Sequence, residues 1–310
     1  MRGALLLAGL LTAAAVAEGA VRAFCAVRTF SDIRRNHYAW TALAPNRYDA
    51  ALELEGLKPD YHAALAACGR TIRYDTAPAP NPEWGYRING APGDSGPVYG
   101  VILGDSFTEG RHVDNSRTFA SRLSALSGRR FLNAGRVAAR GGPTNHLEYL
   151  TASRLLDLKP KVVILQLNPT DIQDELRRAS RREAPAHAAL LRSSVLAFHV
   201  YHAFFAKTFA PKPSQDLAGS HARMKTAIDG LIALGRRHGF KVLVLVDDVA
   251  ALGPEAEHAR KRGVLLDAGI GDQAKHFRFD GHINEAGHEE VAQRIWLRIN
   301  EPGWPSRTAR

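Results

Sequence analysis

Cysteine and methionine are scarce in this 310-residue chain, which has two of each. The two cysteines, Cys25 and Cys68, are too few for a disulfide-stabilised scaffold and allow at most one bridge. The sequence also has no internal repeat, no zinc-ligand spacing, no aromatic strand of the RNA-recognition type and no helix-turn-helix pattern. We therefore expect neither a metal ion nor a nucleic acid partner.

Acidic residues are in the minority, because 41 lysines and arginines face 31 aspartates and glutamates, giving a net charge of +10. The excess gathers in short clusters, namely Arg177, Arg178, Arg181, Arg182, Arg236, Arg237, Arg260 and Lys261. Such a surface favours anionic lipid or polysaccharide, although an ordinary solvated surface explains it more simply. The length and the 45% of hydrophobic residues fit one α/β domain with a single sizeable core and an additional segment.

The N-terminus lacks an apolar run long enough to cross a bilayer as a helix. Its uncharged stretch, Ala4 to Ala17, falls short of the roughly 20 residues that a span needs. Arg2 precedes this stretch, and Ala15-Val16-Ala17 before Glu18 has the form of a signal-peptide cleavage site. Residues 1–22 are therefore expected to be either a cleaved signal peptide or, where the helix continues through Val21 to Val27, a retained membrane anchor, and the protein is expected to be exported.

Residues 23–96 form an N-terminal extension rich in proline, for which loop and packing roles are expected. From residue 97 to residue 300, strand-like and helix-like segments alternate, which predicts a parallel sheet with helices on both faces. Strands are predicted at Val98–Leu103, Arg130–Asn133, Lys161–Leu167, Phe240–Val246 and Gly263–Asp267, and helices at Thr118–Leu126, Asn145–Leu158, His221–His238 and Asn284–Ile299. The fold class is thus a three-layer α/β/α sandwich around a mostly parallel sheet of about five strands.

Two further segments complete the domain organisation. Ala186–Phe209 is predicted to be a helical insertion whose apolar residues pack on the main domain, with a membrane-surface helix or an acyl-chain pocket as the alternative. Residues 301–310 are expected to be a disordered tail.

A serine follows the first predicted strand of the domain, in the segment Gly104-Asp105-Ser106-Phe107-Thr108-Glu109-Gly110. A hydroxyl group is a poor nucleophile, so it needs a histidine as base and a carboxylate that orients this histidine. Asp280 and His282 meet this need, because side chains two residues apart in an extended segment lie on the same side. His288 competes as the base, but His282 is favoured because Asp280 can orient it.

With these motifs the chain resembles the SGNH/GDSL hydrolase family over roughly residues 97–300. The resemblance is closest to a bacterial envelope branch, where an N-terminal membrane segment and a block like Tyr86-Arg87-Ile88-Asn89 precede the Gly-Asp-Ser strand. It implies a flavodoxin-like fold, a Ser106-His282-Asp280 triad, and no metal or organic cofactor. It also implies a place in the periplasm or an anchor in the inner membrane that faces the periplasm.

The resemblance further implies an oxyanion hole with three donors. The first is the backbone N–H of Ser106, and the second is a glycine after the second strand, either Gly141 or Gly142, with Gly135 as an outside candidate. The third is normally an asparagine immediately before an aspartate. Here Thr170 occupies that position before Asp171, and Asn168 stands two residues earlier.

Two outcomes follow for this third donor. Either Asn168 or the Thr170 hydroxyl rebuilds the hole, or the hole is weakened and turnover is slow. Asp171 itself is expected to cap the following helix.

The expected function is therefore a serine-dependent esterase or deacetylase that acts on an O-acyl ester, with an envelope carbohydrate or lipid as substrate. One alternative is an O-acyltransferase of an envelope polysaccharide, which would use the same residues but pass the acyl group to a sugar hydroxyl. The second alternative is a non-catalytic envelope protein that binds carbohydrate.

Overall fold

The computed structural model describes residues 9–17, 19–20, 76–78, 80, 85–89, 96–110, 113–135, 142–180, 216–277 and 281–304. Most of the N-terminal extension, the whole predicted insertion at 186–209, Gly141 and Asp280 therefore lie outside the described residues.

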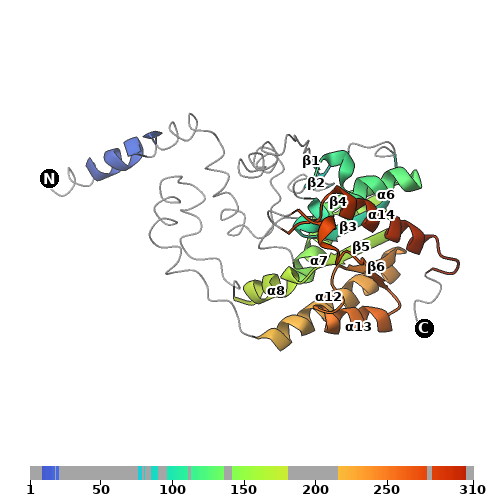
Figure 1. Ribbon diagram of the computed structural model, residues 1–310. Helices are drawn as coiled ribbons and strands as arrows, with labels where there is room; N and C mark the ends of the chain where they lie inside the picture. Colours follow the sequence, from blue (N-terminus) through green and yellow to red (C-terminus); the bar gives the residue numbers. More distant parts are fainter. Residues whose placement is uncertain are drawn as a thin grey trace.

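Seven strands form one sheet in the order β1-β2-β4-β3-β5-β6-β7. Their bounds are β1 Thr76–Pro78, β2 Gly85–Arg87, β3 Val98–Gly104, β4 Arg130–Gly135, β5 Val162–Leu167, β6 Lys241–Val246 and β7 Leu265–Asp267 (Figure 1). The five strands from β4 to β7 pair in parallel, whereas β1 and β2 are antiparallel additions at the β4 edge. Numbered along the chain, the parallel strands have the order 2-1-3-4-5, which is the flavodoxin-like order.

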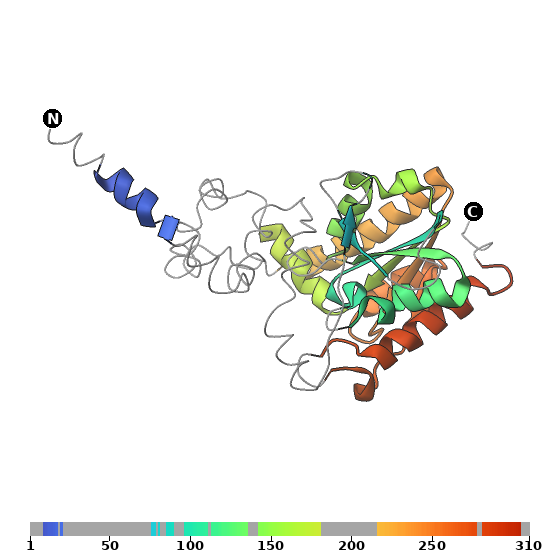
Figure 2. The same cartoon turned by 90° about the horizontal axis from the view of Figure 1, so that it is seen from above.

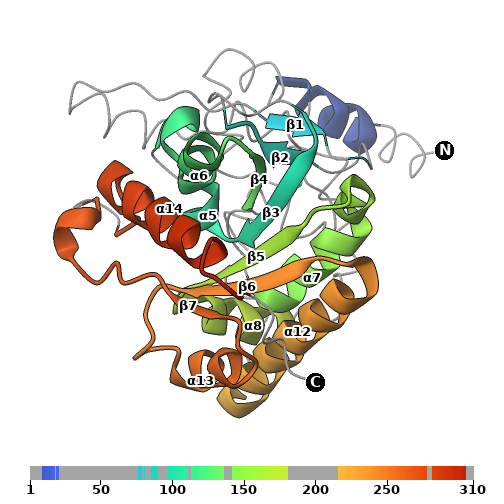
Figure 3. The same cartoon turned by 90° about the vertical axis from the view of Figure 1, so that its right-hand side faces the viewer.

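Helices cover both faces of this sheet (Figure 2). Their bounds are α5 Ser106–Glu109, α6 Phe119–Ser127, α7 Pro143–Ala152, α8 Thr170–Ser180, α12 Leu217–His238, α13 Gly253–Lys261 and α14 Glu285–Ile299. Short 3-10 turns lie at η1 Asn115–Arg117, η2 Leu155–Leu158 and η4 Gln273–Lys275. Helices α6 and α14 pack on one face, and α7 and α12 pack on the other (Figure 3).

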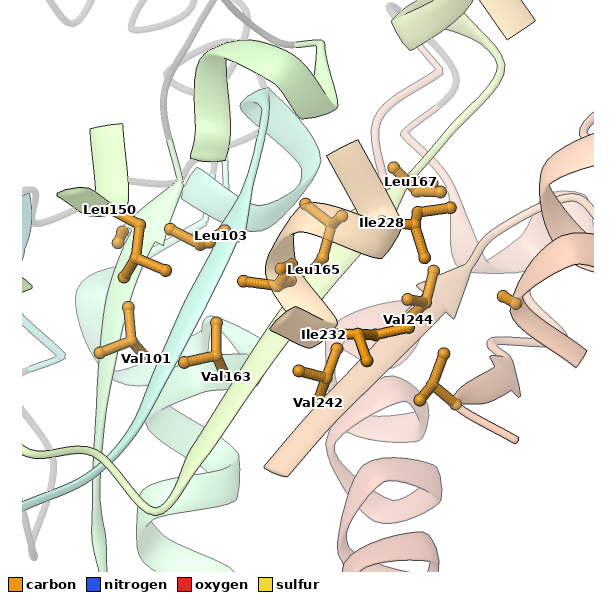
Figure 4. Close-up of a cluster of buried hydrophobic side chains, with 14 of the residues drawn as sticks. Val101, Leu103, Leu150, Val163, Leu165, Leu167, Ile228, Ile232, Val242 and Val244 are labelled. Carbon is orange, nitrogen blue, oxygen red and sulfur yellow. The ribbon is translucent and has the colours of Figure 1, made fainter. Parts of the chain in front are cut away.

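Alternation of side chains along the central strands divides the core into two layers. On β5, Val163 and Leu165 belong to the layer beneath α7 and α12, whereas Ile164 belongs to the layer beneath α6 and α14. Figure 4 shows the first layer, where Ile228 and Ile232 of α12 lie against β5 and β6. Strands buried on both faces are expected for a parallel sheet that helices cover on both sides.

The five strands predicted for the main domain are all present, and the three-layer α/β/α architecture is confirmed. The helix predicted for Asn145–Leu158 is wrong in its second half, because α7 ends at Ala152 and a separate 3-10 turn follows. The cause is local, since Arg154 and Lys159, which flank that turn, both adopt positive φ, 61° and 51°. Helix α13 and strand β1 were not predicted, and α8 was expected only as a helix near Asp171, without bounds.

The two ends of the chain are described in part. Residues 301–304 form a turn in which Trp304 packs against the core and its carbonyl accepts a hydrogen bond from Lys241 Nζ at 3.1 Å. These four residues belong to the folded domain, and residues 305–310 lie outside the described part. At the other end, residues 9–17 and 19–20 are helical, with Leu10, Leu11 and Val16 exposed. Within the described residues, no helix has the length and apolar character that a membrane crossing requires.

Candidate active site

Ser106 is the first residue of the one-turn helix α5, directly beyond the carboxyl end of β3. The preceding residue, Asp105, caps this helix because its Oδ1 accepts the backbone N–H of Phe107 at 2.9 Å. Gly110 ends the helix in the left-handed conformation, with φ 79°. The carboxyl edge of a parallel sheet is where such folds bind ligands. The serine therefore lies where the sequence predicted a nucleophile.

The structure brings His282 to this serine, because Nε2 of the imidazole lies 2.7 Å from Ser106 Oγ. The loop that carries His282 is held by its backbone, since the N–H of Phe277 donates to the His282 carbonyl at 2.7 Å. Asn284 then caps α14 by accepting the N–H of Ala286 at 3.0 Å. The ring of Phe107 packs on the imidazole, with the centroids 4.8 Å apart. Ser106 and His282, which are 176 residues apart in sequence, are thus held at hydrogen-bond distance from each other.

His288, the competing base, is fully buried in the first turns of α14. Its Nδ1 accepts the backbone N–H of Phe119 at 3.1 Å, and the two rings stack with centroids 5.6 Å apart. Burial, together with the charges of Arg87 and His282, lowers the pKa of His288 to about 3. The geometry therefore favours His282 as the base. Asp280, the predicted orienting carboxylate, lies outside the described residues.

The two side chains considered for the third oxyanion donor meet at Asp105. Asn168 Nδ2 donates to Asp105 Oδ2 at 2.7 Å, and the Thr170 hydroxyl lies 3.1 Å from the same oxygen. Asn168 Oδ1 accepts the backbone N–H of Thr170 at 2.8 Å. An amide nitrogen carries two hydrogens and Asp105 takes one of them, so Asn168 retains a second donor beside the nucleophile helix.

The candidate glycines have different surroundings. Gly135 donates its N–H to Asn133 Oδ1 at 3.1 Å, and a Cβ added to it would lie 2.2 Å from Glu109 N. This glycine therefore allows β4 to approach α5 closely, and its N–H is already used. Gly142 is the N-cap of α7, where it provides no side-chain cap. Gly141 lies outside the described residues.

A side chain from helix α8 caps the start of α7, because Gly142 has no side chain that could do so. Glu175 of α8 is fully buried and its Oε1 accepts the backbone N–H of Thr144 at 2.9 Å. A Cβ added to Gly142 would lie 2.7 Å from this oxygen, so the glycine is needed for the contact. The start of α7, and with it the end of the candidate oxyanion loop, is thereby fixed to α8.

Two further carboxyl groups lie at the same edge of the sheet, and sequence analysis missed their connection to the site. Burial, and next the charge of Asp105, raise the pKa values of both Asp171 and Asp247. Gln166 of β5 donates to Asp247 Oδ2 and accepts the hydroxyl hydrogen of Thr108 at 2.9 Å. A hydrogen-bonded chain therefore joins the end of β6 to helix α5. The available signal was the position of Asp247 directly after a buried strand.

Within the described part of the chain, no group of three histidine, cysteine, aspartate or glutamate side chains could hold a metal ion.

No protein-family model matches the sequence, and no curated protein matches it either. Among solved structures, the chain is similar to a member of the lipolytic G-D-S-L protein family from Veillonella parvula, with 13% identity, a TM-score of 0.41, and coverage of 66% of this chain and 100% of that one. It is also similar to a psychrotrophic esterase from Pseudoalteromonas sp., with 10% identity, a TM-score of 0.42, and coverage of 67% and 99%. A third is a catalytic mutant of an acetylxylan esterase from Geobacillus stearothermophilus, with 11% identity, a TM-score of 0.40, and coverage of 66% and 94%. Identities and scores this low carry no inference about activity, so the chemistry rests on this chain's own side chains.

Proposed function

We propose that this chain is a serine-dependent ester hydrolase. The observation that carries the proposal is the distance of 2.7 Å between Ser106 Oγ and His282 Nε2 at the carboxyl edge of the sheet. A histidine at this distance can accept the hydroxyl proton as the oxygen attacks an acyl carbonyl, which is the arrangement that activates a serine. The SGNH/GDSL resemblance in the sequence motifs points to the same chemistry.

The reaction proceeds in two halves. Ser106 Oγ bonds to the acyl carbon while its proton passes to His282, and His282 then returns that proton to the departing alcohol. In the second half, His282 takes a proton from water, the hydroxide bonds to the acyl carbon, and the carboxylic acid leaves as Ser106 regains its hydrogen. We assign to Asp280 the role of orienting His282.

Charge on the carbonyl oxygen needs donors during both halves. Ser106 is the first residue of α5, so its backbone N–H has no acceptor within the helix and is the first donor. The second amide hydrogen of Asn168 is our choice for another donor, because the Thr170 hydroxyl already lies close to Asp105 and to Asn168 Oδ1. A backbone N–H at Gly141 or Gly142 completes the proposed hole.

We further propose that the substrate is an O-acyl ester of an envelope carbohydrate or lipid and that the enzyme works outside the cytoplasm. The signal-like pattern from Arg2 to Glu18 supports export. The exposed apolar side chains of the N-terminal helix, such as Leu10 and Leu11, suit a membrane anchor. The periplasm, or the periplasmic side of the inner membrane, is the location we propose.

The test is covalent labelling of the full-length protein with a fluorophosphonate probe, with the adduct located by mass spectrometry. We expect one adduct at Ser106, and none in the Ser106→Ala and His282→Ala variants. Ser153→Ala is a matched control, because this buried serine follows the far end of α7 and its hydroxyl donates to the Tyr149 carbonyl there. An unlabelled wild-type protein with a native circular dichroism spectrum would contradict the proposal and favour a carbohydrate-binding role. With labelling established, transfer of the acyl group to a sugar hydroxyl instead of water would identify an acyltransferase.

A further inference from the structure

Helix α5 is too short to hold its own position. It has a single turn, with backbone bonds from Glu109 N to Asp105 O at 2.9 Å and from Gly110 N to Ser106 O at 3.1 Å. The carbonyls at the end of a helix have no partners within it, so they must find donors elsewhere. Because Ser106 starts this turn, whatever fixes the end of the turn also fixes where the serine lies.

Buried side chains supply these donors: Asn133 Nδ2 donates to the Glu109 carbonyl at 3.3 Å, and Arg87 makes the larger and shorter set of bonds. Arg87 of β2 is 1% exposed, and its Nη1 donates to the carbonyls of Glu109 and Gly110 at 2.6 Å each. Its Nη2 donates to the Val113 carbonyl, and its Nε donates to Asn115 Oδ1 at 3.0 Å. The guanidinium group of Arg87 therefore bonds the last turn of α5 and also Val113 and Asn115 beyond it.

The position of the charge suits this task. The guanidinium lies at the carbonyl end of α5, where backbone dipoles carry partial negative charge. Its fork of donors in one plane reaches four acceptors at fixed angles, which the single ammonium group of lysine cannot reproduce. Arg87 comes from a strand that pairs with β4 through Arg87 and Asn133, so the backbone that carries the fork is itself anchored to the sheet.

We propose that Arg87 is a positioning residue for the ester chemistry: it fixes the carbonyl end of α5 and so places Ser106 relative to His282. The inference rests on the proposed function. It also gives strand β2, which the sequence marks as part of a proline-rich extension, a role in the active site beyond covering the edge of the sheet.

The test compares two buried residues of the same segment. Arg87→Lys keeps a positive charge but loses the fork, whereas Asn89→Ala removes hydrogen bonds from Asn89 Nδ2 to the Phe131 carbonyl at 2.5 Å and to Ser124 Oγ at 3.3 Å, neither of which touches α5. A displacement of about 1 Å at a reacting group can cost about 100-fold in rate. We therefore expect the Arg87→Lys variant to lose between about 10-fold and 100-fold in fluorophosphonate labelling rate and in kcat for a p-nitrophenyl ester, with KM little changed.

Asn89→Ala should lower the melting temperature while the labelling rate of the folded protein stays within about threefold of wild type, since it alters the edge of the sheet but not the nucleophile turn. As a rescue, guanidinium chloride at a low, non-denaturing concentration should raise the labelling rate of an Arg87→Ala variant, and ethylammonium should not. If neither Arg87 variant folds, Asn115→Ala replaces them, because it removes one acceptor of the guanidinium and should slow labelling of a folded protein.

The outcomes separate this proposal from the one on which it rests. Labelling of wild type at Ser106, with a normal rate in a folded Arg87→Lys or Asn115→Ala variant, would overturn the positioning role and leave the hydrolase proposal intact. Equal slowing in the Arg87→Lys and Asn89→Ala variants would also overturn it, because the effect would then belong to the whole segment. Absence of labelling in folded wild type would overturn both proposals.

Discussion

The buried imidazole of His288 should make this protein sensitive to mild acid. Its pKa is about 3 in the folded state, against an ordinary value of 6.5. The unfolded chain therefore binds a proton that the folded chain does not, and stability rises with pH. The contribution is fully present above pH 6.5 and is lost as the pH falls towards 3.

The size of the loss follows from the unfolded imidazole alone. Protonating a group of pKa 6.5 stabilises the unfolded state by about 2.1 kcal/mol at pH 5 and by about 0.2 kcal/mol at pH 7. Protonation of His288 in the folded protein changes the free energy of the folded state by almost nothing at either pH, for any folded-state pKa below about 4. His288 should thus reduce the free energy of unfolding by about 1.9 kcal/mol between pH 7 and pH 5.

The assay is urea unfolding of wild type and of a His288→Gln variant at both pH values. Glutamine keeps an oxygen that can accept the backbone N–H of Phe119, which now donates to His288 Nδ1. The other titrating groups are common to both proteins, so their contributions largely cancel in the comparison. Wild type should lose about 1.9 kcal/mol more than the variant on acidification. Equal losses would show that His288 takes up its proton without unfolding, and would refute the inferred burial. Since His282 is the proposed base, the variant should still be labelled at Ser106 at pH 7.

Three other changes test the surroundings of the site. The pKa of Asp171 is raised, so its ionisation destabilises the fold as the pH rises above about 4. In urea titrations, the Asp171→Asn variant should therefore lose less unfolding free energy than wild type between pH 5 and pH 8. An equal dependence on pH in the two proteins would contradict this. Gly135→Ala would place a Cβ 2.2 Å from Glu109 N and should cost about 1–3 kcal/mol in thermal unfolding and slow Ser106 labelling, whereas the control Gly253→Ala meets open space and should do neither. Asn168→Ala should lower kcat by about 100-fold or more as a lost oxyanion donor, whereas Thr170→Val should cost less than about 10-fold, and the reverse order would assign the donor role to Thr170.

The sheet could be predicted from sequence because its signal is local. Runs such as Val162–Leu167 are apolar except for Gln166 and are bounded by turn residues, so each strand is visible without knowledge of its neighbours. The bounds of helix α8 were missed for the opposite reason. Its start depends on two side-chain bonds, from the Thr170 N–H to Asn168 Oδ1 at 2.8 Å and from the Asn168 N–H to Asp171 Oδ2 at 2.9 Å, and Pro169 lies between these residues and obscures the boundary.

The residues of the site likewise fall into those that the sequence could predict and those that it could not. Ser106 and His282 could be found because each lies in a short motif whose chemistry is recognisable without a structure. Arg87 could not be assigned a role, because its partners at Glu109 to Asn115 are 22 to 28 residues away and most of them are backbone carbonyls, which leave no trace in side-chain identity. Asn115 accepts from Arg87 through its side chain. The Glu175 cap on α7 is hidden for the same reason, since its partner is the backbone of Thr144.

The role of Asp105 gives a reason why several carboxyl groups lie close together at the carboxyl edge of the sheet, although their charges repel one another. Its carboxylate holds the start of α5, Asn168 and Thr170 together, so it fixes both the turn that carries the nucleophile and the proposed donor. Burial, and next this same negative charge, raise the pKa values of Asp171 and Asp247, which costs stability wherever those groups ionise. Removing Asp105 would relieve that repulsion but release three elements of the site at once. A destabilising arrangement is expected to persist where positioning depends on it, and the cluster of carboxyl groups beneath Ser106 has that character.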